Sequence, residues 1–415
     1  MEIGILAILF CVSTYSMLAK RLSTTIITAP MVFLAIGVVM SYFGILGVYD
    51  SKEVSHLVAE IALIVLLFLD ASQISIKQLK SQNAWPTRML LIGLPLAIIF
   101  GTLVGMVFFP EWPLALVALV AAIMAPTDAA LGQAVISNPA VPIDERQTLS
   151  VESGLNDGFA LPIILFFASL VAMTSGSQSD ETDWLLFGAS QVLVGGAVGL
   201  AMGWASGKVF LFSESRKLTS NVYEGIGVLA LTGSSYLLAE VLGGNGFISA
   251  FVAGLAFGNL VKGHCRFIYE FTESEGQMLI WASFLFIGIG LLPQAIENIS
   301  WQVAGYILVS LFLVRPLAIY LSLIGTTAKP ITRLFFGWFG PRGLATALFA
   351  LLVSKEILND YSHSVLVIAI NAVWISAFLH GITAAPGANW YGKIASRLAT
   401  STAQVNAEKS ESHKP

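Results

Sequence analysis

Residues 146–173, RQTLSVESGLNDGFALPIILFFASLVAM, combine the length of a membrane-spanning helix with a polar interruption near their centre. A helix needs about 20 apolar residues to cross the hydrocarbon core of a bilayer. The interruption places four polar side chains close together: Glu152, Ser153, Asn156 and Asp157. At about 100° per residue they share one arc of about 140° on the helix. The stretch therefore predicts a membrane helix with a polar face.

The whole chain has the composition of a multi-pass membrane protein. Only 11% of its 415 residues are charged and 56% are hydrophobic, whereas soluble domains are roughly a quarter charged. Mean hydropathy is +0.81. A net charge of −4 and two cysteines give no sign of nucleic-acid binding or of a disulfide scaffold. The composition thus predicts an all-α membrane protein.

Apolar windows separated by turns and charges predict thirteen transmembrane helices. They form a transmembrane domain over residues 1–390, and a short cytoplasmic tail covers 391–415. The core helices lie in about 113–173 and 301–385. The thirteen expected spans are 3–19, 29–48, 54–71, 88–109, 113–136, 146–173, 184–212, 221–241, 245–261, 274–294, 301–324, 333–353 and 363–385.

The positive charges between the spans predict the orientation, because Lys and Arg accumulate in short cytoplasmic connections. With the N-terminus outside, seventeen of nineteen such cations fall on the inner side, and only Lys52 and Lys355 fall outside. We therefore expect a multi-pass protein of a bacterial plasma (inner) membrane with a cytoplasmic C-terminus.

Five charged residues lie inside the expected spans, where an ionised group costs about 3 to 10 kcal/mol unless it is paired or faces water. They are Asp128, Glu152, Asp157, Arg315 and Arg342. With 1.5 Å of rise per residue, Asp128, Asp157, Arg315 and Arg342 fall near the middle third of the membrane. We expect these charges to meet.

The third expected span adds two acidic residues. Glu60 is a further candidate within that span, and Asp70 lies at its inner edge, where it can reach water.

Two spans that run in opposite directions each carry a proline next to an ionisable residue. Pro126 precedes Thr127 and Asp128, and Pro341 precedes Arg342. A proline inside a helix removes a hydrogen bond and frees backbone carbonyls. Interrupted helices at matching places in inverted repeats indicate the substrate site of a transporter. We expect the functional centre at these two breaks.

The residue types near the breaks favour an alkali cation, because hydroxyl, amide, carboxylate and carbonyl oxygens are hard ligands. Three acids against two arginines leave one negative charge, which one cation or one proton neutralises. Asp157 is the expected unpaired carboxylate, with Glu152 as the partner of an arginine. No pattern of an enzyme or of a bound cofactor is present.

Each assignment has a structural alternative. Asp157 could be capped by backbone N–H groups, and Ser153 and Asn156 could be interhelical hydrogen bonders. Glu152 and Arg315 are expected to form a structural ion pair. Arg342 could satisfy carbonyls of the broken helix or lie on the ion path, and Glu60 could be structural or line the pore.

The motifs, taken together, resemble those of NhaP-type sodium/proton antiporters and their sodium/hydrogen exchanger relatives in the cation:proton antiporter-1 family. The resemblance covers essentially the whole membrane domain and rests on five runs in this order: Phe68-Leu69-Asp70, Pro126-Thr127-Asp128-Ala129, Glu152-Ser153-Gly154-Leu155-Asn156-Asp157, Val314-Arg315-Pro316 and Gly340-Pro341-Arg342-Gly343.

The resemblance implies a thirteen-helix antiporter with inverted repeats, crossed unwound helices 5 and 12, and a dimerisation domain beside a core domain. It implies a homodimer with elevator-like alternating access. It also implies that Asp157 binds both Na+ and H+, that Thr127, Ser153 and, through water, Asp128 complete the site, and that Glu152 pairs with Arg315 and contacts Asn156. Because Asn156 precedes the essential aspartate, the chain resembles electroneutral one-for-one exchangers.

The sequence leaves the function open among several candidates. Sodium (or lithium)/proton antiport is the leading hypothesis, and potassium/proton antiport by the same architecture is its rival. A passive cation channel would need polar positions along a whole helix, and a transporter-like receptor would need a signalling domain. The expected partners are Na+ (or K+ or Li+), H+ and the lipid bilayer.

Overall fold

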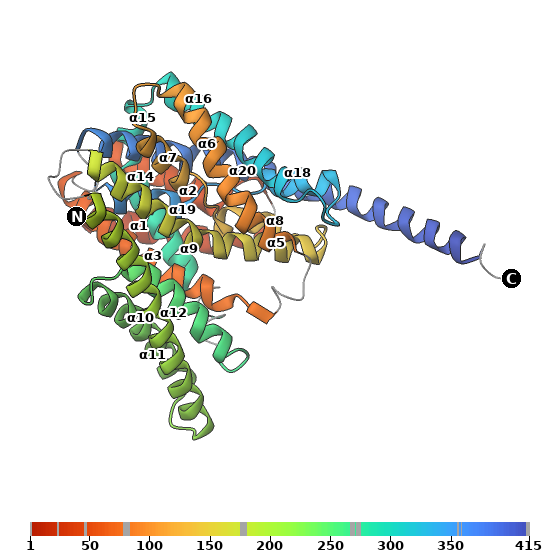
Figure 1. Ribbon diagram of the computed structural model, residues 1–415, viewed down its shortest axis with the longest axis horizontal. Helices are drawn as coiled ribbons and strands as arrows, with labels where there is room; N and C mark the ends of the chain where they lie inside the picture. Colours follow the sequence, from red (N-terminus) through yellow and green to blue (C-terminus); the bar gives the residue numbers. More distant parts are fainter. Residues whose placement is uncertain are drawn as a thin grey trace.

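The computed structural model is a bundle of helices (Figure 1). It describes residues 2–22, 25–44, 48–77, 84–174, 181–265, 270, 275–354, 357 and 359–411, and these residues contain no strand. The helices of the first half are α1 (Glu2–Leu22), α2 (Ala29–Tyr42), α3 (Val48–Gln73), α5 (Trp85–Arg88), η1 (Met89–Gly93), α6 (Leu94–Phe108), α7 (Leu114–Ile123), α8 (Ala129–Ile136), α9 (Ile143–Thr174) and α10 (Glu181–Ser215).

The second half of the chain continues the bundle. Its helices are α11 (Asn221–Val241), α12 (Gly246–Leu260), α14 (Glu275–Gly290), α15 (Leu292–Glu297), α16 (Trp301–Val309), η2 (Ser310–Val314), α17 (Arg315–Ser322), α18 (Pro330–Trp338), α19 (Leu344–Val353) and α20 (Asn359–Glu411). The elements η1 and η2 are single π-helical turns inside longer helices. Each precedes a proline at the second position of the following helix, Pro95 or Pro316.

Six helices of the described chain are long and apolar enough to cross a membrane: Gly4–Leu22, Trp85–Phe108, Ile143–Met173, Gly188–Ser215, Trp301–Ser322 and Tyr361–Arg397. Further apolar helices are shorter, and two of them, α7 and α19, are shortened by breaks in their spans. The expectation of an all-helical membrane protein is therefore confirmed.

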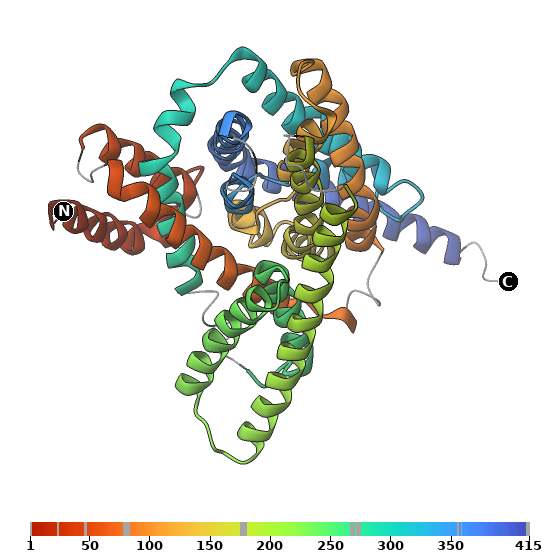
Figure 2. The same ribbon diagram turned by 60° about the vertical axis from the view of Figure 1, so that its left-hand side comes forward.

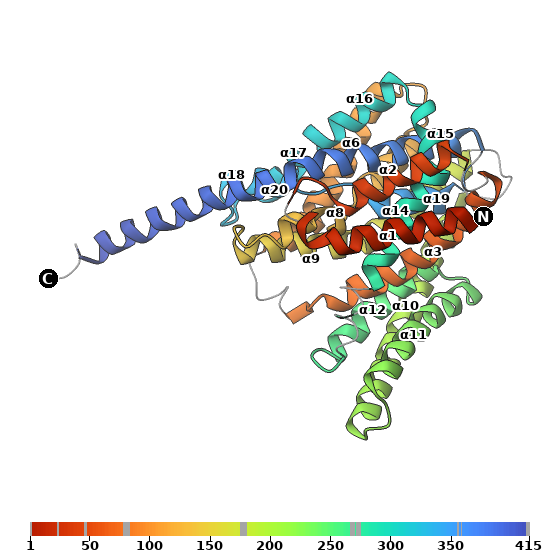
Figure 3. The same cartoon turned by 180° about the vertical axis from the view of Figure 1, so that it is seen from behind.

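The last helix differs from the expected span. The sequence predicts a span over 363–385 and a short tail from residue 391, and the structure has one helix, α20, that runs without interruption from Asn359 to Glu411. It passes through Pro386 and projects beyond the rest of the bundle at its C-terminal end (Figures 1 and 3). A second difference lies in the tenth expected span, which the structure divides into two helices, α14 and α15.

The helices pack in two groups. The first, which we call the scaffold group, contains α2, α3, α10, α11, α12 and α14, and it includes extensive contacts of α12 with α3 and α10. The second, the core group, contains the helices from α5 to α9 and from α16 to α20. The hairpin of α10 and α11 extends away from the core group (Figure 2). The two groups meet where α9 contacts α3, α10 and α12, where α19 contacts α3 and α14, and where α20 contacts α2.

The broken helices occupy the centre of the core group. Every residue of α7 from Leu116 to Ile123 is buried, and α19 is buried along nearly its whole length. A helix that is apolar on all sides belongs in such an interior position. The breaks that follow α7 and precede α19 therefore lie deep inside the protein.

The start of α9 is fixed by the C-terminal helix. The hydroxyl group of Tyr391 on α20 donates a hydrogen bond of 2.8 Å to Glu145 in the first turn of α9. The same hydroxyl lies 2.8 Å from that of Thr332 on α18. The Tyr391 ring is buried and stacks on Phe335. These contacts connect α20 to α9 and to α18, the helix before the second break.

Candidate functional site

The helical breaks occur at the two predicted prolines. Between α7 and α8 the chain is non-helical over 124–128, and between α18 and α19 it is non-helical over 339–343. The two segments touch: the backbone N–H of Asp128 donates to the carbonyl oxygen of Pro341 over 2.9 Å. The structure thus brings Pro126 and Pro341, 215 positions apart in the sequence, into one region.

Asp128 caps both helices that follow the breaks. Its Oδ1 accepts the backbone N–H of Ala130 in α8 over 2.7 Å, and its Oδ2 accepts that of Leu344 in α19 over 2.7 Å. The first N–H groups of a helix have no partner within the helix, and an aspartate before the helix satisfies them. A side chain at Gly343 would collide with the Asp128 carboxylate, so this close approach requires glycine.

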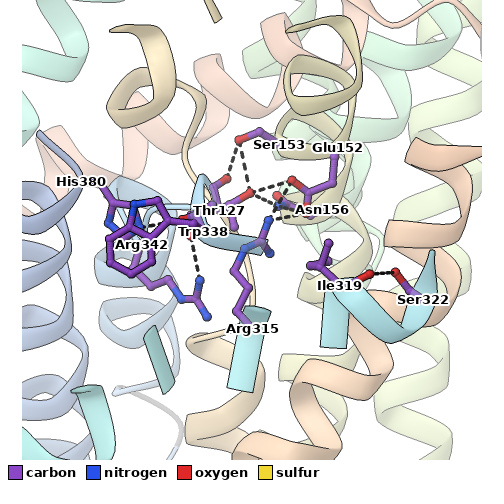
Figure 4. A network of polar contacts seen from close by, with 11 residues as sticks. Thr127, Glu152, Ser153, Asn156, Arg315, Ile319, Ser322, Trp338, Arg342 and His380 are labelled. Atoms are coloured by element: carbon purple, nitrogen blue, oxygen red, sulfur yellow. Dashed lines mark hydrogen bonds and ion pairs between the residues drawn. The ribbon is translucent and has the colours of Figure 1, made fainter. Parts of the chain in front are cut away.

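Glu152 is the centre of a buried polar network (Figure 4). Both of its carboxylate oxygens accept from Nη2 of Arg315, over 3.1 and 3.2 Å. The Thr127 hydroxyl donates to Oε2 over 3.2 Å, and the Asn156 amide lies 3.4 Å from Oε1. Glu152 and Arg315 are 3% and 2% exposed. Each charge therefore has its counter-charge inside the protein.

Two further bonds join α9 to the first break. The Asn156 amide donates to the Thr127 hydroxyl, and the Ser153 hydroxyl donates to the Thr127 carbonyl oxygen over 2.8 Å. The Thr127 carbonyl oxygen, which lies in the break, thus accepts one hydrogen bond, and its second lone pair remains available as an acceptor. The Asn156 side-chain oxygen is buried and has no partner among the described residues.

Asp157 follows Asn156 on α9 and lines a cavity of about 280 Å3. Its Oδ1 is buried and has no hydrogen-bond partner among the described residues. Asp128, Ser153 and Asp70 line the same cavity. Three carboxylates and a hydroxyl group consequently share one space between α3, α8, α9 and the start of α19.

From the sequence, Asp70 is expected at the membrane edge and outside the site, whereas the structure places it on the cavity that Asp157 lines. It reaches this position because α3 packs against α9: a Cβ atom at Gly154 would lie 3.9 Å from that of Asp70. The signal for Asp70 was its place in the run Phe68-Leu69-Asp70.

Arg342 is fully buried and belongs to the second break. Its Nη1 donates to the carbonyl oxygen of Gly340 over 2.8 Å, and its backbone N–H donates to the Ser376 hydroxyl over 2.7 Å. Figure 4 shows its side chain beside Trp338 and His380, away from Ser153. Of the two alternatives for Arg342, these contacts match the binding of carbonyls in the broken helix.

Glu60 lies apart from the other predicted residues. It accepts a hydrogen bond of 2.8 Å from the Tyr236 hydroxyl, which joins α3 to α11. Ten residues separate it from Asp70, or about 15 Å along a helix. Glu60 is not among the described residues that line the cavity.

The cavity is closed on one side. Its lining includes Gln73 at the end of α3, Ile136 at the end of α8 and Ser150 early in α9, and we call this end of the bundle the open end. Beyond Asp157 in the other direction, Leu161, Ile164 and Ala168 of α9 are buried in the apolar core. Oxygen ligands at such a site can hold a small hydrated or partly dehydrated cation or a proton, with access from one end.

A family model described as "Sodium/hydrogen exchanger, transmembrane" matches residues 5–390. The chain belongs to this family. The predicted resemblance to NhaP-type antiporters and sodium/hydrogen exchangers is thereby confirmed.

Two relatives of this exchanger chain bear NhaP names. It is 25% identical over 397 residues to the K(+)/H(+) antiporter NhaP of Alkalimonas amylolytica, covering 94% of this chain and 66% of the relative. It is 27% identical over 341 residues to the K(+)/H(+) antiporter NhaP2 of Shewanella oneidensis, covering 81% of this chain and 57% of the relative. The chain therefore spans less than two thirds of the length of these curated relatives.

The exchanger fold is also found in a solved structure. The sodium proton antiporter MjNhaP1 of Methanocaldococcus jannaschii at pH 8 matches with a TM-score of 0.77 and 21% identity. The match covers 94% of this chain and 98% of that one. This likeness establishes the fold.

Proposed function

We propose that this exchanger-family chain is a secondary active antiporter that exchanges one monovalent cation, Na+ or also Li+, for one H+. The single observation that carries the proposal is the position of Asp157, which has a buried oxygen without a donor and faces a cavity shared with Asp70 and Asp128. An oxygen in this position can take up a cation or a proton, but not both, so the two compete.

The neighbouring groups have distinct roles in this proposal. Ser153 and Asp128 offer oxygens with lone pairs on the cavity that Asp157 lines. Thr127 is not among the described residues that line that cavity, and its carbonyl oxygen accepts the hydrogen bond from the Ser153 hydroxyl. The carboxylate of Asp70 adds negative charge that attracts cations into the cavity. Glu152 and Arg315 hold α9 against α17 and neutralise each other.

The hydrogen bonds of Asn156 support electroneutral exchange. Its amide is neutral and donates to Thr127 and Glu152, so it carries no exchangeable charge. Glu152 is already paired with Arg315, and both oxygens of Asp128 accept backbone N–H groups. Asp157 can then exchange one proton for one monovalent cation, and the charge of the site is the same with either one bound.

The closed side of the cavity favours an antiporter over a passive channel. A channel needs a continuous polar path, whereas α9 beyond Asp157 contributes Leu161, Ile164 and Ala168 to the apolar core. A site that is open to one end at a time instead suits alternating access. K+/H+ antiport is the second candidate, because the relatives from Alkalimonas and Shewanella bear that name.

The proposal includes the expected topology and assembly. We infer thirteen crossings in inverted repeats, in a bacterial plasma (inner) membrane, with the N-terminus outside and the C-terminus in the cytoplasm. Seventeen of nineteen connecting cations on the inner side support this orientation. Phe10 and Met17 of α1 are 70% and 83% exposed, which supports a face against lipid or a second copy in a homodimer.

Proteoliposomes with a trapped pH-sensitive dye test the function. We expect Na+ added outside to drive H+ movement in wild type, with Li+ and K+ compared at the same pH. Asp157→Asn removes the shared ligand and is expected to abolish this movement. The matched control is Asp144→Asn, the same change at an exposed position of the same helix, which is expected to keep exchange.

Each result has a clear meaning. No cation-driven H+ movement in wild type would contradict antiport, and retained exchange in Asp157→Asn would contradict the assignment of Asp157. A response to K+ that exceeds the response to Na+ would select the second candidate. Ion flux that persists without movement of a counter-ion would select a channel.

A further inference from the structure

Phe251 packs against α9 at the position that follows Asp157, one residue farther from the open end of the cavity. Gly158 follows Asp157 on α9, and a Cβ atom built at Gly158 would collide with the ring of Phe251 from α12. The Phe251 side chain is only 6% exposed. The absence of a side chain at Gly158 thus creates a seat for this ring at the boundary between the core and scaffold groups.

Gly154 offers an equivalent seat one helical turn away on α9. Residues four apart lie on nearly the same face of a helix. A Cβ atom at Gly154 would meet nothing closer than Ile74 Cδ1 at 3.6 Å, which is ordinary contact. The face of α9 at the group boundary therefore carries two side-chain-free positions, and Phe251 occupies the one farther from the open end.

Phe251 is held by the scaffold group. The next turn of α12 is in close contact with α3, since a Cβ atom at Gly254 would collide with the Phe68 backbone. Two residues before Phe251, the Ser249 hydroxyl donates to the Ser235 carbonyl oxygen of α11 over 2.8 Å. A movement between the two groups would therefore carry α9 past a stationary Phe251.

We propose that Phe251 is the gating residue of the exchanger and takes two seats in turn: Gly158 when the cavity is open as seen here, and Gly154 when access has changed to the other end. This proposal rests on the alternating access of the proposed function. The two seats are four residues apart, so the core group moves by about 6 Å, one helical turn. Steps of one turn are a known way for packed helices to change between two discrete states.

The direction of the step agrees with the position of the cavity. Residue numbers on α9 increase away from the open end. For Phe251 to meet Gly154, α9 must move toward the closed end and carry Asp157 past the ring. The ring would then separate Asp157 from the open end instead of from the closed end.

Replacing glycine by alanine is expected to shift the conformational equilibrium in opposite directions at the two positions. Gly158→Ala fills the seat that is occupied here, so it disfavours the open conformation described here. Gly154→Ala leaves this conformation intact and fills the seat needed for the other one. Overpacked positions are costly enough to shift a two-state equilibrium by about fivefold or more.

A cysteine introduced at position 150 (Ser150→Cys) reports which of the two conformations is present through its accessibility to a labelling reagent, and this measurement does not depend on transport. Ser150 is exposed and lines the cavity in this conformation. After the step it would lie near where Gly154 lies now, and Gly154 is buried. The background carries Cys11→Ala and Cys265→Ala, and the rate of reaction with a hydrophilic maleimide is measured on purified full-length protein.

We expect Gly158→Ala to slow labelling of the Ser150→Cys reporter by about fivefold or more. Gly154→Ala is expected to label at least as fast as the reporter alone and to lose exchange in proteoliposomes. Adding Phe251→Ala to Gly158→Ala removes the collision and is expected to restore labelling. Phe257→Ala is the matched control: this buried ring lies on the same helix but packs on Phe68 and Phe210 within the scaffold group, so labelling is expected to stay unchanged.

Equal labelling rates in the two glycine variants, or slower labelling in both, would overturn the proposal. If Gly158→Ala fails to fold, Gly154→Ala decides alone, and full exchange in that variant would overturn it. Labelling requires neither Na+ nor H+. If the two glycine variants shift labelling in opposite directions but the wild type shows no exchange, antiport is refuted and the gating role of Phe251 stands. If the wild type exchanges ions but the labelling shifts are absent, antiport stands and the gating role is refuted.

Discussion

The carboxylate of Asp128 accepts the backbone N–H of Leu344 over 2.7 Å and so joins two helical breaks that lie far apart in the sequence. The same carboxylate also caps its own helix through Ala130. One short side chain thus accepts hydrogen bonds from backbone N–H groups at the starts of both α8 and α19. The close approach of the two broken spans depends on this residue as well as on the prolines.

We predict that Asp128→Ala destabilises the protein, because two helix starts lose their acceptor. Replacing one capping aspartate by alanine costs about 0.5–2 kcal/mol, and here two bonds are lost together. Thermal unfolding in detergent is expected to show a lower midpoint. Asp128→Asn is the control: its single carbonyl oxygen can retain one of the two bonds, so its midpoint should lie between those of wild type and Asp128→Ala. Equal midpoints for all three proteins would show that these caps contribute nothing.

The ion pair of Glu152 and Arg315 gives a second prediction. Both residues are buried, so Glu152→Gln leaves the Arg315 charge without its counter-charge, at a cost of about 3–5 kcal/mol. The double variant Glu152→Gln/Arg315→Gln removes both charges and is expected to be more stable than Glu152→Gln alone. Unfolding midpoints of wild type, both single variants and the double variant form the measurement. Additive losses would argue that the two side chains act independently.

Asn156 tests the proposed stoichiometry. The Asn156 amide lies 3.4 Å from a Glu152 oxygen, so Asn156→Asp would replace a donor with a second negative charge there. We expect loss of stability and of exchange, without a gain of voltage-dependent exchange. H+ movement in proteoliposomes under an imposed K+ diffusion potential checks this. Wild-type exchange should be independent of the potential, and vigorous voltage-driven exchange in Asn156→Asp would disprove the argument.

The helical breaks and the polar face of α9 could be predicted from the sequence because their causes are local. Pro126 and Pro341 remove helical hydrogen bonds wherever they occur. The spacing of Glu152 and Asn156 places them on one arc of a helix. In both cases the residue type and its spacing are sufficient, and tertiary packing does not need to be known.

The parts that could not be predicted depend on contacts between helices. Whether Asp70 faces the cavity depends on how α3 packs against α9, and the seat of Phe251 depends on the register of α12 against Gly158. The extent of α20 was also missed, because the sequence after the last span is polar and hydropathy marks only where a span ends. Sequence spacing within one helix carries no information on these relations.

Competition at Asp157 gives a pH dependence whose sign follows from the shared site. A bound proton must leave before a cation binds, so the apparent affinity for Na+ weakens as pH falls. In the range where Asp157 is mostly protonated, each unit of lower pH should raise the apparent KM about tenfold, because the proton concentration rises tenfold. The maximal rate at saturating Na+ should change less, since enough cation displaces the proton. Initial rates of H+ movement across a series of Na+ concentrations at several pH values test this, with Asp144→Asn as the control that should follow the wild-type curve. An apparent KM that stays constant while the maximal rate falls would mean that H+ and Na+ bind at separate sites, and the single shared carboxylate would have to be abandoned.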